Sequence, residues 1–345
     1  MAQRVRVDSG TSYEMLLELM CVADRRFRSV ITGAPHIEHS LEAAGAGDVV
    51  ADARTAGRYA WANLLPLAGV GRRARTSEAL RDAVAATSAQ ELHRWVLGGR
   101  RRQLLELVGD DILDGVLTGD RAARSVLRRT LGSDTTVLEA TPWLLSAPSE
   151  EVHALVLRAL EGWAVARGPV GEATLRQELR GSARRLRAVV TGLDPREAIA
   201  VAAPGLDYTS ERMPAEVVLV SSAAVAPIVV FVDDVRRTVL ATPAGMAPRP
   251  ESTEHDRLIA GARAVGDVVR VRVLDVLRDG PAAARELSEA LGQPRTSLLH
   301  HLALLRSAGL VTTAVGPDER TVYRLDASAV DALASTMRRR YGTMR

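Results

Sequence analysis

One stretch near the C-terminus, from Val265 to Leu325, limits the possible folds of this chain more than any other. Apolar residues recur in it at helical spacing in three successive segments. These segments are Val268–Gly280, Ala284–Gly292 and Arg295–Gly309. Each ends at a glycine, which readily adopts the left-handed conformation that closes a helix, and a proline follows soon after each of the first two glycines. The pattern predicts three short helices separated by tight turns.

Two runs rich in β-branched residues follow the third helix. Leu310–Val315 and Arg320–Leu325 flank Gly316-Pro317-Asp318-Glu319, whose residue types are typical of a turn, so a two-stranded hairpin is predicted. Three helices and a hairpin in this order, with only Gln293-Pro294 between the second and third helices, predict a winged helix-turn-helix. In such folds the last of these helices enters the major groove of DNA.

The third helix has one face that we expect to be buried and another that we expect to meet DNA. Leu298, Leu302 and Leu305 recur at helical spacing and form the buried stripe. The candidate DNA-contacting residues of this helix are Arg295, Thr296, Ser297, Leu299, His300 and Arg306. The hairpin adds Arg320 and Arg324, which we expect to contact the phosphate backbone.

The residue types at the start of this helix suit contacts with base edges. Arg295 can pair with guanine, and the hydroxyls of Thr296 and Ser297 can bond bases or phosphates from the helix N-terminus. Leu299 can contact the methyl group of thymine. His300 faces DNA in this interpretation and is not expected to bind a metal together with His301, because adjacent helical side chains point in different directions.

Four segments of this region, AVGDVVRVRVLDVLRDG, ARELSEALG, TSLLHHLALLRSAGLV and TVYRL, resemble the ArsR-type winged-helix regulators of bacteria in their order and spacing. The resemblance covers about the last quarter of the chain. It implies a homodimeric transcriptional regulator that binds a two-fold symmetric DNA operator. Leu299 and His300 stand where many ArsR-type helices carry a small polar residue and an arginine, so the DNA sequence preference does not carry over.

The metal sites of some ArsR-type sensors are not expected here. Cys21 is the only cysteine, which leaves no set of thiolate ligands and no intrachain disulfide. The last helix, predicted from Ser328 to Tyr341, has no histidine to complete a zinc site. His36 and His39 lack the HExxH spacing, so a solvated loop is the default interpretation and zinc the alternative. We therefore predict no metal and no cofactor.

The larger, N-terminal part of the chain is predicted to be mainly helical. The segments SYEMLLELMCVADRRF, VLRALEGWAVARG and AEVVLVSSAAVAPIVVFVDD resemble a long helical domain of unknown function that precedes winged helices in some actinobacterial regulators. Helix periodicity and start signals predict helices at Tyr13–Arg28, Thr55–Leu67, Ser77–Leu97, Arg100–Leu107, Arg121–Arg129, Ser149–Ala166 and Ala173–Thr191. After Asp194-Pro195, three β-branched runs predict a small antiparallel sheet, at Glu216–Ser222, Pro227–Val232 and Arg237–Ala241.

The predicted fold class is mainly α: a multi-helix N-terminal domain with a small antiparallel β-sheet, followed by a C-terminal winged helix-turn-helix. The expected domains are 1–195, a helical sensor, 196–250, the β region with a proline-rich linker, and 258–345, the DNA-binding domain. Residues from Leu258 onward hold thirteen arginines and nine acidic residues, a net charge of +4 against +3 for the whole chain. This local excess fits a surface that faces phosphates.

We expect neither a leader nor a membrane segment from the sequence. A polar stretch, Asp8 to Ser12, follows Val7, and the longest uncharged run, Val217 to Val232, is too short and too interrupted to span a bilayer. Together with the single cysteine, this predicts a cytoplasmic protein without a membrane partner.

All four tryptophans lie in the helical part: Trp61, Trp95, Trp143 and Trp163. Filling of the core is the simpler interpretation of these side chains. The alternative is a cavity lined by some of them, which would bind a small apolar ligand between helices.

These patterns predict a DNA-binding transcriptional regulator, a repressor controlled by a small organic effector. A different class of function remains open, in which the winged helix is a protein-protein or dimerisation module on a helical scaffold. No enzyme is predicted, because the sequence contains no GxSxG, Walker or strand-associated GxGxxG motif.

Overall fold

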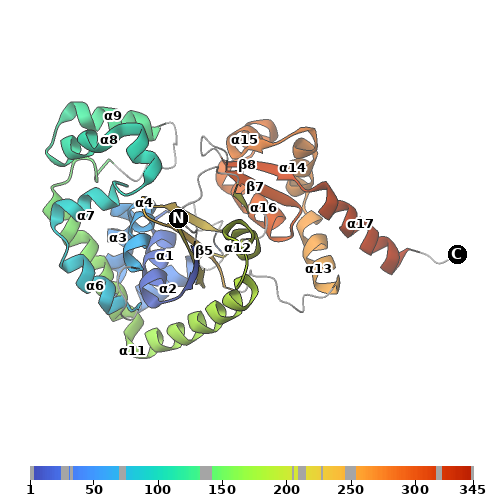
Figure 1. Ribbon diagram of the computed structural model, residues 1–345, viewed down its shortest axis with the longest axis horizontal. Helices are drawn as coiled ribbons and strands as arrows, with labels where there is room; N and C mark the ends of the chain where they lie inside the picture. The colour runs from blue at the N-terminus through green and yellow to red at the C-terminus, as the bar shows by residue number, and fades with distance from the viewer. Residues whose placement is uncertain are drawn as a thin grey trace. The chain divides into compact units, whose positions relative to one another are not determined.

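The computed structural model describes most of the chain as two compact units, each formed from two separate parts of the sequence (Figure 1). The described residues are 4–24, 31, 34–69, 75–132, 142–203, 206–208, 215–226, 228–244, 254–315 and 321–342. The helical unit contains Met1–Arg184 and Pro214–Pro243, and the winged-helix unit contains Arg185–Met213 and Ala244–Arg345. The mainly α fold with a C-terminal winged helix is confirmed.

Helix α1 (Thr11–Ala23) forms the centre of the helical unit. Every one of its residues is buried, because its sequence is apolar on all sides apart from a few polar groups. It is in contact with strand β3 (Glu216–Ser222) and with five shorter helices. These are α2 (Ala34–Ala43), α3 (Gly47–Ala56), α4 (Arg58–Asn63), α5 (Leu65–Ala68) and α6 (Ser77–Ala85).

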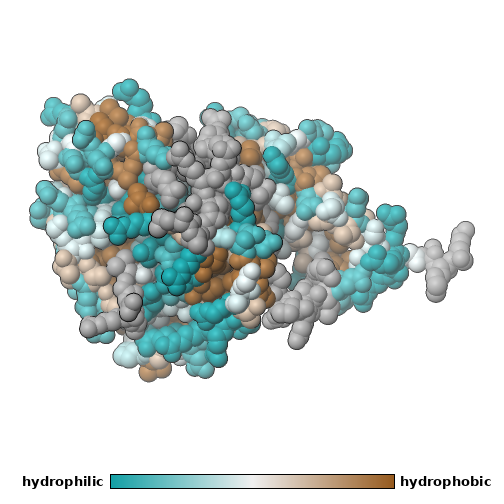
Figure 2. All heavy atoms as spheres, in the orientation of Figure 1, coloured by the Kyte–Doolittle hydropathy of each residue, from teal (hydrophilic) through white to brown (hydrophobic). Residues whose placement is uncertain are grey.

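The remaining helices of this unit are longer or pair with one another. Helix α7 (Ala89–Val96) leads into α8 (Arg102–Leu117), which packs against α9 (Arg121–Gly132). The side chain of Leu107 on α8 is 64% exposed, and apolar residues show on the surface of this helix pair in Figure 2. Helix α11 (Ser149–Val190) is bent where Gly168, with φ 63°, precedes Pro169. Its last residues belong to the winged-helix unit.

The sheet of the helical unit brings the N-terminus next to a distant part of the chain. Its order is β1-β3-β5-β4, where β1 is Arg4–Asp8, β4 is Val230–Asp233 and β5 is Thr238–Pro243. The pairs β1–β3 and β3–β5 are parallel, and β4–β5 is antiparallel. All three predicted strands form.

The pairing differs from the antiparallel sheet expected from sequence, because only β4 and β5 form a hairpin and β5 lies between β3 and β4. The predicted boundaries also differ from the two units, since β3, β4 and β5 belong with the N-terminal helices. The physical reason is the same in both cases. Strand β1 pairs with β3 across more than 200 residues, with Arg4 opposite Glu216, a contact that local patterns do not reveal.

The winged-helix unit contains the three predicted helices and the hairpin in the expected order. They are α14 (Val268–Asp279), α15 (Ala284–Leu291), α16 (Arg295–Ser307), β7 (Val311–Val315) and β8 (Thr321–Leu325). Helix α13 (Glu254–Val265) precedes them and packs against α17 (Ala327–Tyr341), which follows them. Strand β6 (Ala282–Ala283) pairs with β8. The hairpin tip, residues 316–320, lies outside the described residues.

Two elements from an earlier part of the chain complete this unit. Helix α12 (Pro195–Ala202) begins with a capping box, in which the Asp194 carboxylate accepts from the backbone N–H of Glu197 and the Glu197 carboxylate accepts from that of Asp194. Strand β2 (Leu206–Tyr208) follows and pairs in parallel with β7, so the sheet of the wing has the order β2-β7-β8-β6. Among the described residues, no helix has the length and apolar character needed to cross a membrane.

Candidate nucleic-acid interface

The first two helices of the winged helix are fixed by polar contacts at their ends. Asp267 caps α14, and its carboxylate accepts from the backbone N–H groups of Val269 and Arg270 at 2.9 and 3.1 Å. These hydrogen bonds lower the pKa of Asp267, and the one from the Arg270 N–H has the largest effect. The Glu286 carboxylate accepts from the backbone N–H of Ala283 at 2.7 Å at the start of α15. Both caps satisfy backbone donors that a helix start leaves free.

A tight turn connects α15 to α16. Gly292 ends α15 with φ 60°, the left-handed conformation that glycine adopts at least cost. The Ser288 hydroxyl donates to the backbone carbonyl of Gln293 at 2.6 Å and thereby holds the turn. The N-cap residue of α16 is Pro294, whose side chain has no hydrogen-bond acceptor. Pro294 therefore leaves the first N–H groups of α16 without an N-cap acceptor, an arrangement that suits phosphate binding.

Helix α16 is held in place by the leucine stripe that the sequence predicted. Leu298, Leu302 and Leu305 are buried in a hydrophobic core that joins α14, α15, α16 and β7. On the edge of this stripe, His301 lies 3.5 Å from the Asp267 carboxylate, measured from Nδ1 to Oδ1. The core thus fixes how α16 is rotated about its axis, and with it the side chains that it presents.

The predicted contact residues on α16 occupy different environments. Arg295, Thr296, Ser297 and His300 lie in its first two turns; the side chain of Ser297 is partly exposed, and those of the other three lie outside the described part of the structure. Leu299 packs against the hydrophobic core as a partly buried residue. Arg306 is half-buried near Tyr323 of β8, and burial lowers its pKa. The flank of α16 that carries Leu299 and Arg306 therefore has less free surface than the sequence suggested.

The predicted hairpin contacts are described only in part. Arg324 is exposed on β8, opposite Thr312 of β7. Arg320 falls in the hairpin tip and lies outside the described residues. The sequence did not single out Asp267, although an aspartate directly before an amphipathic helix is a recognisable N-cap signal.

Three helices around one core, with a hairpin after the third, define a winged helix-turn-helix DNA-binding module. Residues 267–313 match the family model described as "Bacterial regulatory protein, arsR family". The chain therefore carries an ArsR-type helix-turn-helix domain, as its motifs predicted, and this domain indicates a DNA-binding transcriptional regulator. No curated protein and no solved structure matches the chain. The resemblance of the N-terminal segments to a helical domain of unknown function stays a prediction.

The four tryptophans share one hydrophobic core in the helical unit. Trp61 and Trp163 are fully buried, and Trp95 and Trp143 pack against the same core as partly buried residues. The indole N–H of Trp61 donates to the Ala53 carbonyl at 3.0 Å. Filling of the core thus accounts for Trp61 and Trp163.

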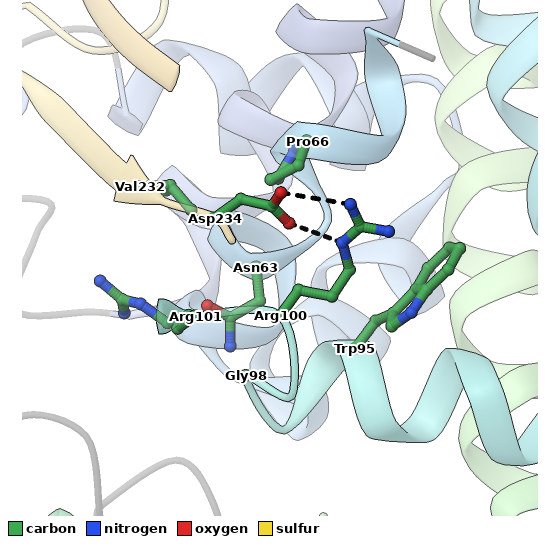
Figure 3. Close-up of a pocket in the computed structure, with 8 residues that line it drawn as sticks. All are labelled: Asn63, Pro66, Trp95, Gly98, Arg100, Arg101, Val232 and Asp234. Carbon is green, nitrogen blue, oxygen red and sulfur yellow. Dashed lines mark hydrogen bonds and ion pairs between the residues drawn. The ribbon is translucent and has the colours of Figure 1, made fainter. Parts of the chain in front are cut away.

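One small hollow of the helical unit has Trp95 on its wall (Figure 3). The Arg100 guanidinium makes two hydrogen bonds to the Asp234 carboxylate, of 2.6 and 3.2 Å, and lies 5.1 Å from the centre of the Trp95 ring. The space between these side chains is too small to admit even a water molecule. Pockets that hold drug-sized ligands have roughly 300 to 1,000 Å³, so the hollow as it stands is not a ligand pocket.

Two buried carboxyl groups lie one turn apart on α1. Glu14 accepts from the backbone N–H of Ala224 at 2.7 Å, and burial, together with the neighbouring Glu18, raises its pKa to about 8. Burial likewise raises the pKa of Glu18, which forms an ion pair with Arg167. No group of three or more potential metal ligands occurs among the described residues. Sequence reasoning missed this pair, whose only signal is their spacing on a helix that is otherwise apolar.

Proposed function

We propose that this protein is a homodimeric repressor that binds a two-fold symmetric DNA site through α16 and is controlled by a small organic effector. The observation that carries the DNA-binding part is the position of α16. Its leucine stripe is buried, its N-cap residue Pro294 offers no acceptor to the first N–H groups, and its first two turns carry Arg295, Thr296, Ser297 and His300. This arrangement suits insertion of the helix N-terminus into the major groove.

The test is a titration of the full chain with labelled DNA from the region upstream of its own gene, read by fluorescence anisotropy. We expect tight binding to a two-fold symmetric site and a steep loss of affinity as salt rises, since neutralised phosphates release counterions. A random duplex of equal length is the control. Equal affinity for both duplexes, or affinity that does not change with salt, would favour the alternative in which the winged helix is a protein-protein module.

The proposed dimer is supported by apolar side chains on the two helices that flank the winged helix. Ile259 on α13 and Met337 and Tyr341 on α17 are 38%, 42% and 66% exposed. No residue of α17 is buried, and its surface in Figure 2 is otherwise largely hydrophilic. In the proposed dimer these apolar side chains would be covered by the partner subunit. Light scattering of Met337→Asp/Tyr341→Asp should show a monomer if these residues form the dimer contact.

The proposed effector control rests on the separate core of the helical unit and on the hollow beside Trp95. Because this hollow has no room for a ligand as it stands, an effector would have to displace the Arg100 side chain from the Trp95 ring. An effector can alter DNA affinity only if it binds the DNA-competent and incompetent forms unequally, by about 1.4 kcal/mol for each tenfold change.

A panel of small apolar compounds tests this part of the proposal. An effector should change the tryptophan emission of the wild type, should change it less in Trp95→Phe, and should shift the DNA titration in the wild type. Compounds that alter the fluorescence and leave DNA affinity unchanged would argue for a scaffold and against a sensor.

Repression is tested by placing the upstream region before a reporter gene, whose output should rise when the protein is absent.

A further inference from the structure

The wing has a fourth strand that comes from outside the helix-turn-helix. Strand β2 pairs with the outer edge of β7, with Leu206 opposite Thr313, Asp207 opposite Ala314 and Tyr208 opposite Val315. The match to the ArsR-type family begins only at residue 267, so β2 is not part of it. Because the two strands are parallel, β2 runs toward the hairpin tip and ends beside the last residue of β7.

The pairing buries side chains on one face of the wing. Leu206 and Thr313 are 7% and 3% exposed, and paired residues of neighbouring strands point to the same side of a sheet. Strand β2 is also held from the other end, because the backbone N–H of Leu206 donates to the Ala203 carbonyl at 2.9 Å, directly after α12. The strand is therefore fixed both to α12 and to the wing.

Without β2 the outer edge of β7 would be unpaired. Strands β7 and β8 have five residues each, and β6, which completes the sheet on the other side, has two. A free edge strand leaves a row of backbone groups unpaired. Pairing with β2 covers that edge of β7 at residues 313–315, next to the hairpin tip.

The connectivity ties this strand to the helical unit on both sides. The segment Arg185–Met213 contains α12 and β2. Before it in the chain lies the part of α11 that ends at Arg184, and after it lie the strands β3 to β5. These flanking parts belong to the helical unit. The chain therefore connects β2 directly to both α11 and β3, two elements of the helical unit. No other described strand of the wing comes from this segment.

We propose that β2 is a regulatory strand: while it is paired with β7 the wing is ordered for DNA binding, and its release weakens binding. This inference rests on the proposed DNA-binding function and adds the means by which the helical unit controls it. Order in the free protein favours binding because less conformational freedom is lost when the complex forms. The release of three residue pairs is a small change that a bound effector can bring about.

The first experiment compares full-length Leu206→Asp with Leu206→Ile, which keeps an apolar β-forming side chain at the same place. A charge at this buried position should detach β2. We expect amide hydrogens of residues 311–315 to exchange at least ten times faster in Leu206→Asp, and its affinity for the cognate duplex to fall about tenfold, with Leu206→Ile close to wild type. Circular dichroism of each variant establishes that the helices remain folded.

The second experiment locks the strand. In a Cys21→Ala background, Leu206→Cys with Thr313→Cys places two thiols on paired residues of neighbouring strands, a separation that a disulfide can span. The oxidised protein should bind DNA at least as tightly as the reduced protein. Weaker binding on oxidation, or tighter binding by Leu206→Asp, would overturn the proposal. Equal exchange of residues 311–315 in wild type and Leu206→Asp would overturn it without any use of DNA, whereas absence of DNA binding in the wild type would instead refute the proposed function.

Discussion

The indole N–H of Trp163 donates a hydrogen bond of 2.7 Å to the buried carboxylate of Glu18. Trp163 lies on α11 shortly before its bend, and Glu18 lies on the central helix α1. Arg167, one turn further along α11, forms an ion pair with the same carboxylate. This contact fastens α11 to the centre of the helical unit by polar interactions within an apolar core.

Replacing Trp163 by phenylalanine should weaken the helical unit by more than the loss of packing. The Glu18 oxygen would lose its donor while buried, which typically costs about 1 to 3 kcal/mol. Urea unfolding followed by the fluorescence of the other three tryptophans, all in the helical unit, measures the effect. Trp143→Phe, a partly buried residue of the same core, is the control. Equal losses in the two variants would show that the hydrogen bond contributes nothing beyond packing.

The raised pKa of Glu14 predicts a dependence of stability on pH. A carboxyl whose pKa is about 8 in the folded state and 4.5 in an unfolded chain favours folding in its protonated form. Its contribution is complete below the unfolded value and is lost as pH rises through about 8. The free energy of unfolding should therefore fall between pH 5 and 9, by an amount on the order of a few kcal/mol.

The isosteric Glu14→Gln variant tests this assignment. It should remove most of the decline with pH, because the amide stays neutral and its carbonyl oxygen can still accept from the Ala224 N–H. Glu78→Gln, an exposed acid of α6, should leave the profile of the wild type unchanged. A Glu14→Gln profile as steep as that of the wild type would place the titrating group elsewhere.

Removal of the Asp267 cap should loosen the start of α14. Asp267→Ala leaves the N–H groups of Val269 and Arg270 without their acceptor, at a cost of about 1 kcal/mol for a helix N-cap. The amide hydrogens of these two residues should exchange faster, and Asp267→Asn, which retains an acceptor, should restore most of the protection. If the alanine and asparagine variants exchanged at the same rate, the cap would have no measurable role.

Two arginines should affect DNA binding differently. Arg295→Ala, at the start of α16, should cost about 1 to 3 kcal/mol on the cognate site and relax the preference at one base pair. Arg324→Ala, on the exposed side of β8, should weaken cognate and random duplexes to the same extent and reduce the salt dependence. If the two variants lost the same affinity for the cognate and the random duplex, Arg295 would not be a base contact distinct from the phosphate contact of Arg324.

Local patterns were sufficient for the winged helix and insufficient for its surroundings. The leucine stripe of α16 and the glycines that end α14 and α15 determine the helices through interactions within a few residues, so the sequence predicted them almost to the residue. The strand β1 alternates between arginine and valine, yet its partner lies at Glu216–Val220, and no periodicity specifies such a pairing. Strand β2 is too short for any periodic signal and is defined by its pairing with β7.

The candidate site shows the same limit at the level of side chains. Helical spacing placed Leu299 and Arg306 outside the buried stripe, which is correct for the helix alone. The core and strand β8 then cover that flank of α16, so both residues lose surface to contacts that the sequence of one helix does not specify. The burial of Glu14 and Glu18 has a similar origin, because several helices and β3 surround α1.

The interleaved order of the two units has a consequence for how such a regulator can be divided or recombined. A single cut in the segment before α13 would separate the whole ArsR-type match from the rest, but it would leave α12 and β2 behind with the helical unit. A hybrid protein that joined this helix-turn-helix to a foreign sensor at that point would contain α16 but would lack β2, one strand of its wing. A transfer of the complete winged-helix unit to another regulator would therefore have to include the segment between α11 and β3, which contains α12 and β2.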